Sequence, residues 1–302
     1  MKLVSKALAV AIATIGFGAE AHAATVLTGN NPSITVGGSY ILGNAATSIT
    51  ITASDVLLDL GGYTVGNWYS CAMINNGQSP GCSGTGQGTS PAIKATGSNV
   101  MIQNGRVEGA YGDGIVASPA SLGAFLSIVI KDVTVDNNQG HGIILNGNGA
   151  QLTNVQSYQN SQDGILLQDN VRLEHVTTSY NNGAGVNGTA GSGNYLDIST
   201  SRNKGNGIVA NGNLSKIDAK SNASPGIVAS GVLRDSNSEY NTGDGVVANQ
   251  HGVVIDTVSF QNSGNGFTLG TSSCYTGLSA NGNTGTGVSG GTALTGSTAS
   301  CN

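Results

Sequence analysis

A glycine followed by an apolar residue recurs along most of the chain at a nearly constant interval. The pairs are Gly114-Ile115, Gly142-Ile143, Gly164-Ile165, Gly185-Val186, Gly207-Ile208, Gly226-Ile227, Gly245-Val246, Gly266-Phe267 and Gly287-Val288. Successive glycines are separated by 28, 22, 21, 22, 19, 19, 21 and 21 residues. A period near 21 residues without helical periodicity predicts a stack of β-coils, each covering the apolar surface of its neighbour. We expect turn chemistry to explain the many glycines.

Within each repeat, the positions after the glycine alternate between inward and outward directions. The first and third positions are apolar, as in Ile143 and Leu145, and should point into the stacked core. The second position should point outward, yet six of nine such residues are aliphatic: Val116, Ile144, Leu166, Val209, Val228 and Val247. These residues either reflect strand propensity or form an apolar patch for self-association or another partner.

Asparagine stands four residues before the repeat glycine in eight successive coils. The residues are Asn138, Asn160, Asn181, Asn203, Asn222, Asn241, Asn262 and Asn283. Asparagine tolerates the left-handed conformation of a tight turn, and stacked amides can exchange hydrogen bonds. The row therefore predicts an asparagine ladder.

A second polar row lies six residues before these asparagines. It consists of Asp132, Asn154, His175, Asp197, Lys216, Asp235 and Asp256, followed by Gly277. The carboxylates could indicate a metal-binding or catalytic face. A second tight turn is the alternative, because Asp, Asn and His tolerate a positive φ angle better than most residues. Lys216 favours the turn.

These features together resemble the right-handed parallel β-helix proteins of the pectate-lyase-like superfamily, over roughly residues 49–290. The stretch "ITASDVLLDLGGYTV" at 51–65 is similar to the first coil of such proteins. The resemblance implies an all-β fold in one domain, with about eleven coils and a length on the order of 50 Å. We expect an N-terminal cap at about 24–48, coils at about 49–290 and a C-terminal cap at about 291–302.

Two coils contain insertions, at 66–91 and 118–126. We expect both to leave the stack at the same place, after the strand that follows the glycine, and to stand side by side as walls of a binding surface. Trp68, Tyr69 and Phe125 lie in these insertions. They are the candidates for substrate binding.

The residues just before the repeat glycine provide the sharpest catalytic hypothesis. Asp113, His141 and Asp163 occupy this position in three consecutive coils. Two carboxyl groups about 10 Å apart could serve as acid and base in an inverting glycoside hydrolysis. "YGDGI" and "GHG" are similar to motifs of the polygalacturonase family, but that family's Asn-Thr-Asp and Asp-Asp sequences are absent. Turns before glycine also favour Asp, Asn and His, so both explanations stand.

The N-terminus and the cysteines indicate export. Lys2 and Lys6, an apolar stretch at 7–19 and Ala21-His22-Ala23 predict a signal peptide at 1–23. No later stretch is long and apolar enough to suggest membrane insertion. In an oxidising compartment, Cys71 should pair with Cys82 and Cys274 with Cys301.

Charge excludes some partners. The chain has 11 Lys and Arg against 16 Asp and Glu. No basic stripe is available for nucleic acid, and a groove for a strongly acidic polysaccharide would need more cations. We expect no cofactor, with a bound calcium ion as the open alternative. The sequence thus predicts a secreted or periplasmic protein that interacts with polysaccharide or a cell-surface glycan, as a hydrolase or lyase if it is an enzyme. The alternative is a non-catalytic surface, adhesion or structural protein.

Overall fold

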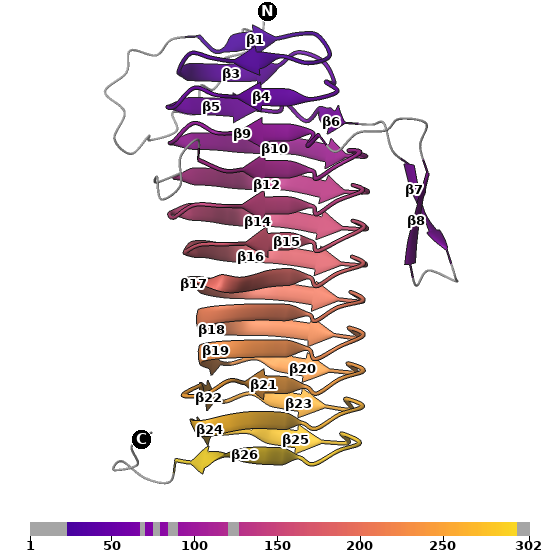
Figure 1. The fold of residues 1–302 in the computed structure, drawn as a ribbon, viewed down its shortest axis with the longest axis vertical. Coiled ribbons are helices and arrows are strands. Elements are labelled where there is room, and N and C mark those ends of the chain that lie inside the picture. The colour runs from indigo at the N-terminus through magenta and orange to yellow at the C-terminus, as the bar shows by residue number, and fades with distance from the viewer. Residues whose placement is uncertain (1–22, 67–69, 75–78, 84–89, 120–126, 295–302) are drawn as a thin grey trace, which may run out of the picture.

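The repeat folds into parallel coils stacked along one axis (Figure 1). The computed structural model describes residues 23–66, 70–74, 79–83, 90–119 and 127–294. These residues form about eleven coils and no helix. The predicted all-β solenoid is therefore confirmed.

Each coil has three faces. Face A is the short strand after the repeat glycine, such as β13 (Ile143–Leu145). Faces B and C are the two halves of a longer strand, such as 150–153 and 155–158 in β14 (Ala150–Tyr158), which turns at Asn154 with a φ of 54°. Neighbouring coils pair in parallel register, with Ile143 beside Ile165 and Leu152 beside Leu173.

The remaining strands follow this plan, and some run across a corner or split. In chain order they are β1 (Thr25–Leu27), β2 (Ser33–Ile34), β3 (Gly38–Leu42), β4 (Ile49–Ile51), β5 (Val56–Asp59), β6 (Thr64–Gly66), β7 (Ser70–Ile74), β8 (Ser79–Ser83), β9 (Ile93–Ala95), β10 (Val100–Glu108), β11 (Ile115–Ala117), β12 (Ile128–Asp136), β15 (Ile165–Leu167), β16 (Val171–Ser179), β17 (Val186–Ser201), β18 (Ile208–Lys220), β19 (Ile227–Arg234), β20 (Asn237–Glu239), β21 (Val246–Ala248), β22 (Val253–Ile255), β23 (Val258–Phe260), β24 (Phe267–Thr276), β25 (Ser279–Asn281) and β26 (Val288–Ala293).

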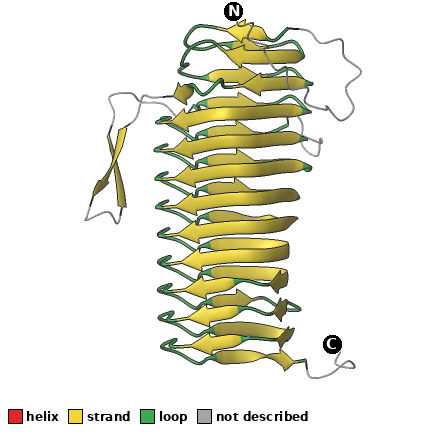
Figure 2. Ribbon diagram, turned by 180° about the vertical axis from the view of Figure 1, so that it is seen from behind, coloured by secondary structure: helices red, strands yellow, loops and turns green. Residues whose placement is uncertain are grey.

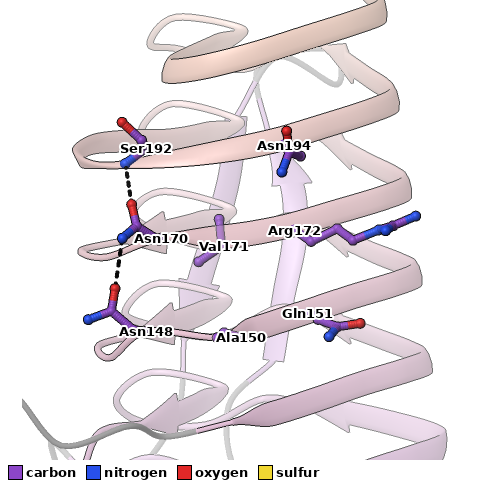
Figure 3. Close-up of a pocket in the computed structure, with 9 residues that line it drawn as sticks. Asn148, Ala150, Gln151, Asn170, Val171, Arg172, Ser192 and Asn194 are labelled. Carbon is purple, nitrogen blue, oxygen red and sulfur yellow. Dashed lines mark hydrogen bonds between the residues drawn. The ribbon is translucent and has the colours of Figure 1, made fainter.

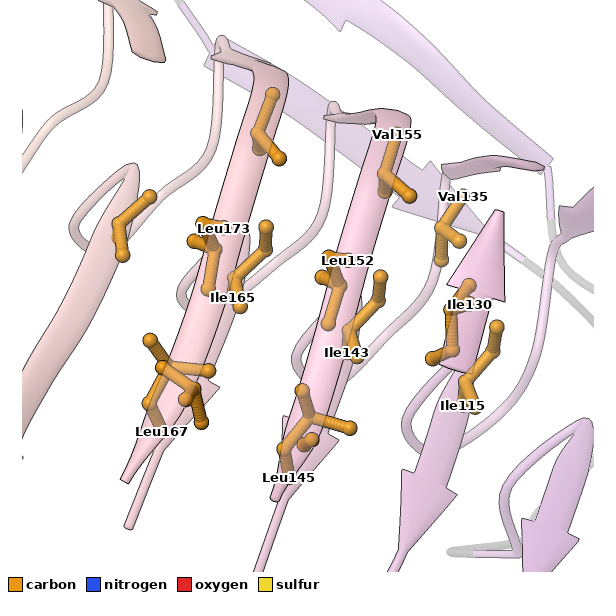
Figure 4. Close-up of a cluster of buried hydrophobic side chains, with 14 of the residues drawn as sticks. Ile115, Ile130, Val135, Ile143, Leu145, Leu152, Val155, Ile165, Leu167 and Leu173 are labelled. Carbon is orange, nitrogen blue, oxygen red and sulfur yellow. The ribbon is translucent and has the colours of Figure 1, made fainter. Parts of the chain in front are cut away.

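Aliphatic side chains from all three faces fill the interior (Figure 4). Ile143 and Leu145 of face A and Leu152 of face B are fully buried, as the alternation predicts. The equivalent residues of each coil stack on those of the next, so the core is a continuous column. Burying one such side chain contributes about 1.5–3 kcal/mol.

The asparagine ladder is present. Each ladder amide donates from Nδ2 to Oδ1 of the next asparagine at 2.9–3.0 Å, from Asn138 to Asn283. The same oxygen also accepts the backbone N–H of the preceding ladder residue, for example that of Asn181 on Asn203 at 3.1 Å. Asn138 through Asn262 are at most 1% exposed. The left-handed residue, however, is the one before each asparagine, such as Tyr180 at a φ of 56°.

All repeat glycines except the last, Gly287, are required for space. A Cβ atom on Gly142 would lie 2.5 Å from the carbonyl oxygen of Gly164 and 2.7 Å from Nδ2 of Asn160. Gly142 does not have a positive φ angle, so its position needs glycine for space and not for a left-handed backbone. The buried ladder and the adjacent coil leave no room for a side chain.

The second polar row marks the corner between faces B and C. Asp132, Asn154, His175, Asp197, Lys216, Asp235, Asp256 and Gly277 all have positive φ angles, between 45° and 64°. The row is therefore a left-handed turn repeated in every coil. This explains why a lysine occurs among the carboxylates.

The two insertions leave the stack at different corners, which corrects the expectation that they stand side by side. β6 pairs with face C of β10 and β9 pairs with face A of β11, so the first insertion lies between faces C and A. The second insertion lies between β11 on face A and β12 on face B. The β7–β8 hairpin projects from the stack (Figures 1 and 2).

Candidate functional site

The structure connects Asp113, His141 and Asp163 through one chain of hydrogen bonds. Oδ1 of Asp113 accepts the backbone N–H of His141 at 2.8 Å, and Nδ1 of His141 accepts the backbone N–H of Asp163 at 3.2 Å. Oδ1 of Asp163 then accepts the N–H of Ala184 at 2.6 Å, while its Oδ2 accepts the amide of Asn187 at 3.1 Å. The three side chains are thus brought together at one corner, as predicted.

These hydrogen bonds have a structural role, because they hold together the turns before the repeat glycines of neighbouring coils. Each side chain accepts the N–H of the residue at the same position in the next coil. The same arrangement recurs far from the candidate site, where Asp244 accepts the N–H of Asn265 at 2.7 Å and Asn265 accepts that of Thr286 at 2.8 Å. Nδ1 of His141 also lies 3.6 Å from Oδ2 of Asp163. The side chain of His141 is 18% exposed and that of Asp163 14%.

Other predicted residues can be placed only in part. Trp68, Tyr69 and Phe125 lie outside the described residues, as does Cys301. The backbone of the β7–β8 hairpin sets Cys71 opposite Cys82, a position that suits a disulfide.

The outer aliphatic row is continuous over several coils. Ile144 lies between Val116 and Leu166 in register, and all three are half-buried. A second run joins Val209, Val228 and Val247. Asn187 separates the two runs.

A charge cluster with one buried carboxylate lies where the first insertion leaves the stack. The guanidinium of Arg106 binds both carboxylate oxygens of Asp136, at 2.7 and 2.5 Å, and lies 3.2 Å from Glu108. Asp136 is completely buried, and burial raises its pKa although the hydrogen bonds from Arg106 oppose the shift. Hydrogen bonding to Asp136 in turn raises the pKa of Arg106.

The position of this cluster gives it a structural role. Arg106 and Glu108 pair with Thr64 and Gly66, the last strand residues before the first insertion. Sequence reasoning missed the cluster because Arg106 and Asp136 are 30 residues apart and occupy different positions of their coils. Only the coil register could have paired them.

A polar hollow crosses three coils at the corner between faces A and B (Figure 3). Its volume is about 500 Å³, and it is lined by Asn148, Gly149, Ala150, Gln151, Asn170, Val171, Arg172, Ser192 and Asn194. Sequence reasoning missed this hollow as well. The equivalent amides at 148 and 170 were the available signal, but the next coil has Ser192 at that position, so no row of amides stands out in the sequence.

Two polar rows border the hollow. Along the corner, Nδ2 of Asn170 donates to Oδ1 of Asn148 at 2.9 Å, and Oδ1 of Asn170 accepts the N–H of Ser192 at 2.9 Å. Along face B, Gln151, Arg172 and Asn194 are in direct register. The hollow also adjoins the second insertion, because Ser127 donates its N–H to the carbonyl of Asn148 at 3.4 Å.

Arg172 is the one charged residue that lines the hollow. Its guanidinium lies 3.0 Å from Glu174, which is not among the lining residues. The charge of the hollow is therefore small. In the described part of the chain, no group of three or more His, Cys, Asp or Glu side chains is placed to hold a metal ion. Nor do the described residues include a helix capable of crossing a bilayer.

The sequence matches no protein-family model and no curated protein. Several solved structures are similar in fold, among them the following three. The AlgE6 A-module of the Azotobacter vinelandii mannuronan C-5 epimerase has 12% identity and a TM-score of 0.52, covering 88% of this chain and 87% of that one. Tailspike gp49 of Acinetobacter baumannii bacteriophage Fri1, a capsular polysaccharide depolymerase, has 10% identity and a TM-score of 0.51, covering 85% of this chain and 57% of that one.

The third is the tailspike receptor-binding protein of bacteriophage Det7, with 10% identity and a TM-score of 0.50, covering 88% of this chain and 73% of that one. At such identities the likeness concerns the fold alone. It confirms the right-handed parallel β-helix fold.

Proposed function

We propose that this chain is an exported protein that binds polysaccharide in the hollow between faces A and B. The single observation that carries the proposal is that side-chain amides and a guanidinium from three consecutive coils line one hollow. Amides both donate and accept hydrogen bonds, as sugar hydroxyls do. Rigid strands hold these groups in place, which lowers the entropic cost of binding.

Two further observations support the proposal. Two of the similar structures are named for action on polysaccharide, the mannuronan epimerase and the capsular polysaccharide depolymerase. The predicted signal peptide and the predicted cysteine pairs fit a protein that meets glycans outside the cytoplasm.

Calorimetric titration with a panel of plant, algal and bacterial polysaccharides tests the proposal. Gln151→Ala should weaken binding at least about fivefold, because it removes an amide from the hollow. Gln156→Ala is the matched control, since Gln156 is also an exposed glutamine of β14 but lies on face C. Equal binding by both variants, or none by the native protein, would refute the proposal.

Glycan cleavage at Asp113, His141 and Asp163 is the second candidate function. The observation that favours it is that hydrogen bonds link the three residues one to the next, at the corner from which the first insertion leaves the stack. Asp163→Asn separates chemistry from structure, because Asn265 shows that an amide oxygen can accept the turn N–H at this position. Loss of product formation with unchanged thermal stability would support catalysis. Unchanged product formation, or none by the native protein, would reject it.

A further inference from the structure

We infer that the hollow takes a neutral polysaccharide whose chain lies along the solenoid axis, with one sugar unit per coil. This inference rests on the proposed function and specifies its ligand. It follows from three properties of the hollow: its two polar rows, its charge and its repeat.

The two polar rows run along the axis, one on either side of the hollow. The corner row is Asn148, Asn170 and Ser192, and the face B row is Gln151, Arg172 and Asn194 (Figure 3). Between the rows the hollow is floored mainly by backbone, because the side chains of Ala150 and Val171 belong to the buried core. A sugar ring has hydroxyls around its edge, and such a ring can place them on the two rows.

The charge of the site favours a neutral ligand. Arg172 is the one cation that lines the hollow, and its guanidinium already pairs with Glu174 at 3.0 Å. A polymer with a carboxylate on every sugar would bring about one anion per coil, whereas Gln151, Asn170 and Asn194 offer only amides. Desolvating unmatched carboxylates there would oppose binding.

The repeat of the hollow sets the length and direction of the ligand. Adjacent coils are separated by about 4.8 Å, close to the advance per unit in an extended pyranose chain. The face B row continues past the hollow to Asn213, whose Nδ2 donates to Oδ1 of Asn194 at 3.1 Å. Four successive coils thus present a polar side chain at the same position, from Gln151 to Asn213.

Titration with oligosaccharides of increasing length tests this inference. The oligosaccharides are fragments of the neutral polymer that binds best in the panel. Affinity should rise from the disaccharide to about the tetrasaccharide and then level off. Asn213→Ala should weaken the tetrasaccharide several-fold and leave the disaccharide unchanged, because Asn213 lies beyond the hollow. A length-independent affinity would overturn the axial arrangement.

The Arg172→Gln variant tests neutrality. Glutamine keeps hydrogen-bonding capacity and removes the charge, so any loss of affinity in Arg172→Gln should be modest and should be the same at about 0.05 and about 0.5 M NaCl. A loss of tenfold or more in Arg172→Gln, or stronger binding of a polyuronate than of any neutral polymer, would overturn the inference. The Gln151→Ala result is independent of both outcomes, so failure of the ligand assignment is distinguishable from failure of the proposed function.

Discussion

The asparagine ladder and the row before the repeat glycine both stack polar side chains at one corner, yet their compositions differ. The ladder is asparagine in eight consecutive coils, and seven of these residues are at most 1% exposed. The row before the glycine contains Asp113, His141, Asp163, Ala184, Asn206, Pro225, Asp244, Asn265 and Thr286. Position in the fold alone does not explain this difference.

Hydrogen-bond demand explains it. A ladder asparagine must donate from Nδ2 and also accept two bonds at Oδ1, as Asn203 does, and burial makes any unmet group costly. The other row offers at most an acceptor for one N–H, so Asp, His and Asn all suffice, and Ala184, whose side chain accepts no hydrogen bond, is tolerated. Pro225 has no N–H and makes no demand on Asn206 in the coil before it.

The largest predicted effect concerns the buried carboxylate of Asp136, which lies two residues before Asn138, the first asparagine of the ladder. Arg106→Leu leaves Asp136 buried without its cation and should lower the free energy of unfolding by about 3 kcal/mol. Urea unfolding measures this loss. The control is Arg234→Leu, an exposed cation, which should stay within about 0.5 kcal/mol. An equal loss of unfolding free energy in Arg106→Leu and Arg234→Leu would show that Asp136 does not depend on Arg106.

Removing one asparagine from the middle of the ladder should lower the free energy of unfolding by about as much as the loss of other buried hydrogen bonds. Asn203→Ala removes the acceptor of Asn181 and the donor to Asn222, so we expect a loss on the order of 1–3 kcal/mol. Thermal or urea unfolding checks it. A neutral Asn203→Ala would show that the ladder is not needed for stability.

Tyr195 is a buried polar group outside both rows. It is 2% exposed, and its hydroxyl has no hydrogen-bond partner in the described part of the chain. Tyr195→Phe should therefore stabilise the fold by about 1 kcal/mol at neutral pH. Unfolding in denaturant measures the gain, with the exposed Tyr63→Phe as control.

The same residue predicts a pH dependence. Burial raises the pKa of Tyr195 to about 12. Between pH 10 and 12 the unfolded phenol loses its proton while the folded one keeps it, so stability falls as pH rises by up to about 2–3 kcal/mol. Tyr195→Phe should remove this component of the decline. An identical decline in the variant would exclude Tyr195 as its source.

The smallest effects should come from the row before the glycine. Asp163→Ala removes the acceptor of Ala184 and should cost about 1 kcal/mol, whereas Asp163→Asn should be neutral within about 0.5 kcal/mol. Melting temperatures of the two variants provide the comparison. A loss in Asp163→Asn as large as that in Asn203→Ala would erase the distinction between the two rows.

Much of the fold could be predicted because its signals are local. The alternation at Ile143 and Leu145, the constant spacing of the asparagines and the left-handed corner at Lys216 each depend on a few neighbouring residues. The position of Asp113, His141 and Asp163 in three consecutive coils followed from the same register, whereas the hydrogen bonds that link them came only from the structure. What those residues do chemically did not follow, since a turn acceptor and a catalytic group can be the same residue type.

The sequence by itself determined the period, the inward and outward positions and the ladder, because these repeat along one chain direction. Only the tertiary structure decided which corner each insertion leaves, that Arg106 reaches Asp136, and that Gln151, Arg172 and Asn194 line one hollow. The physical reason is that such contacts join residues from different coils. Their distances depend on how the coils stack and on the length of every turn between them.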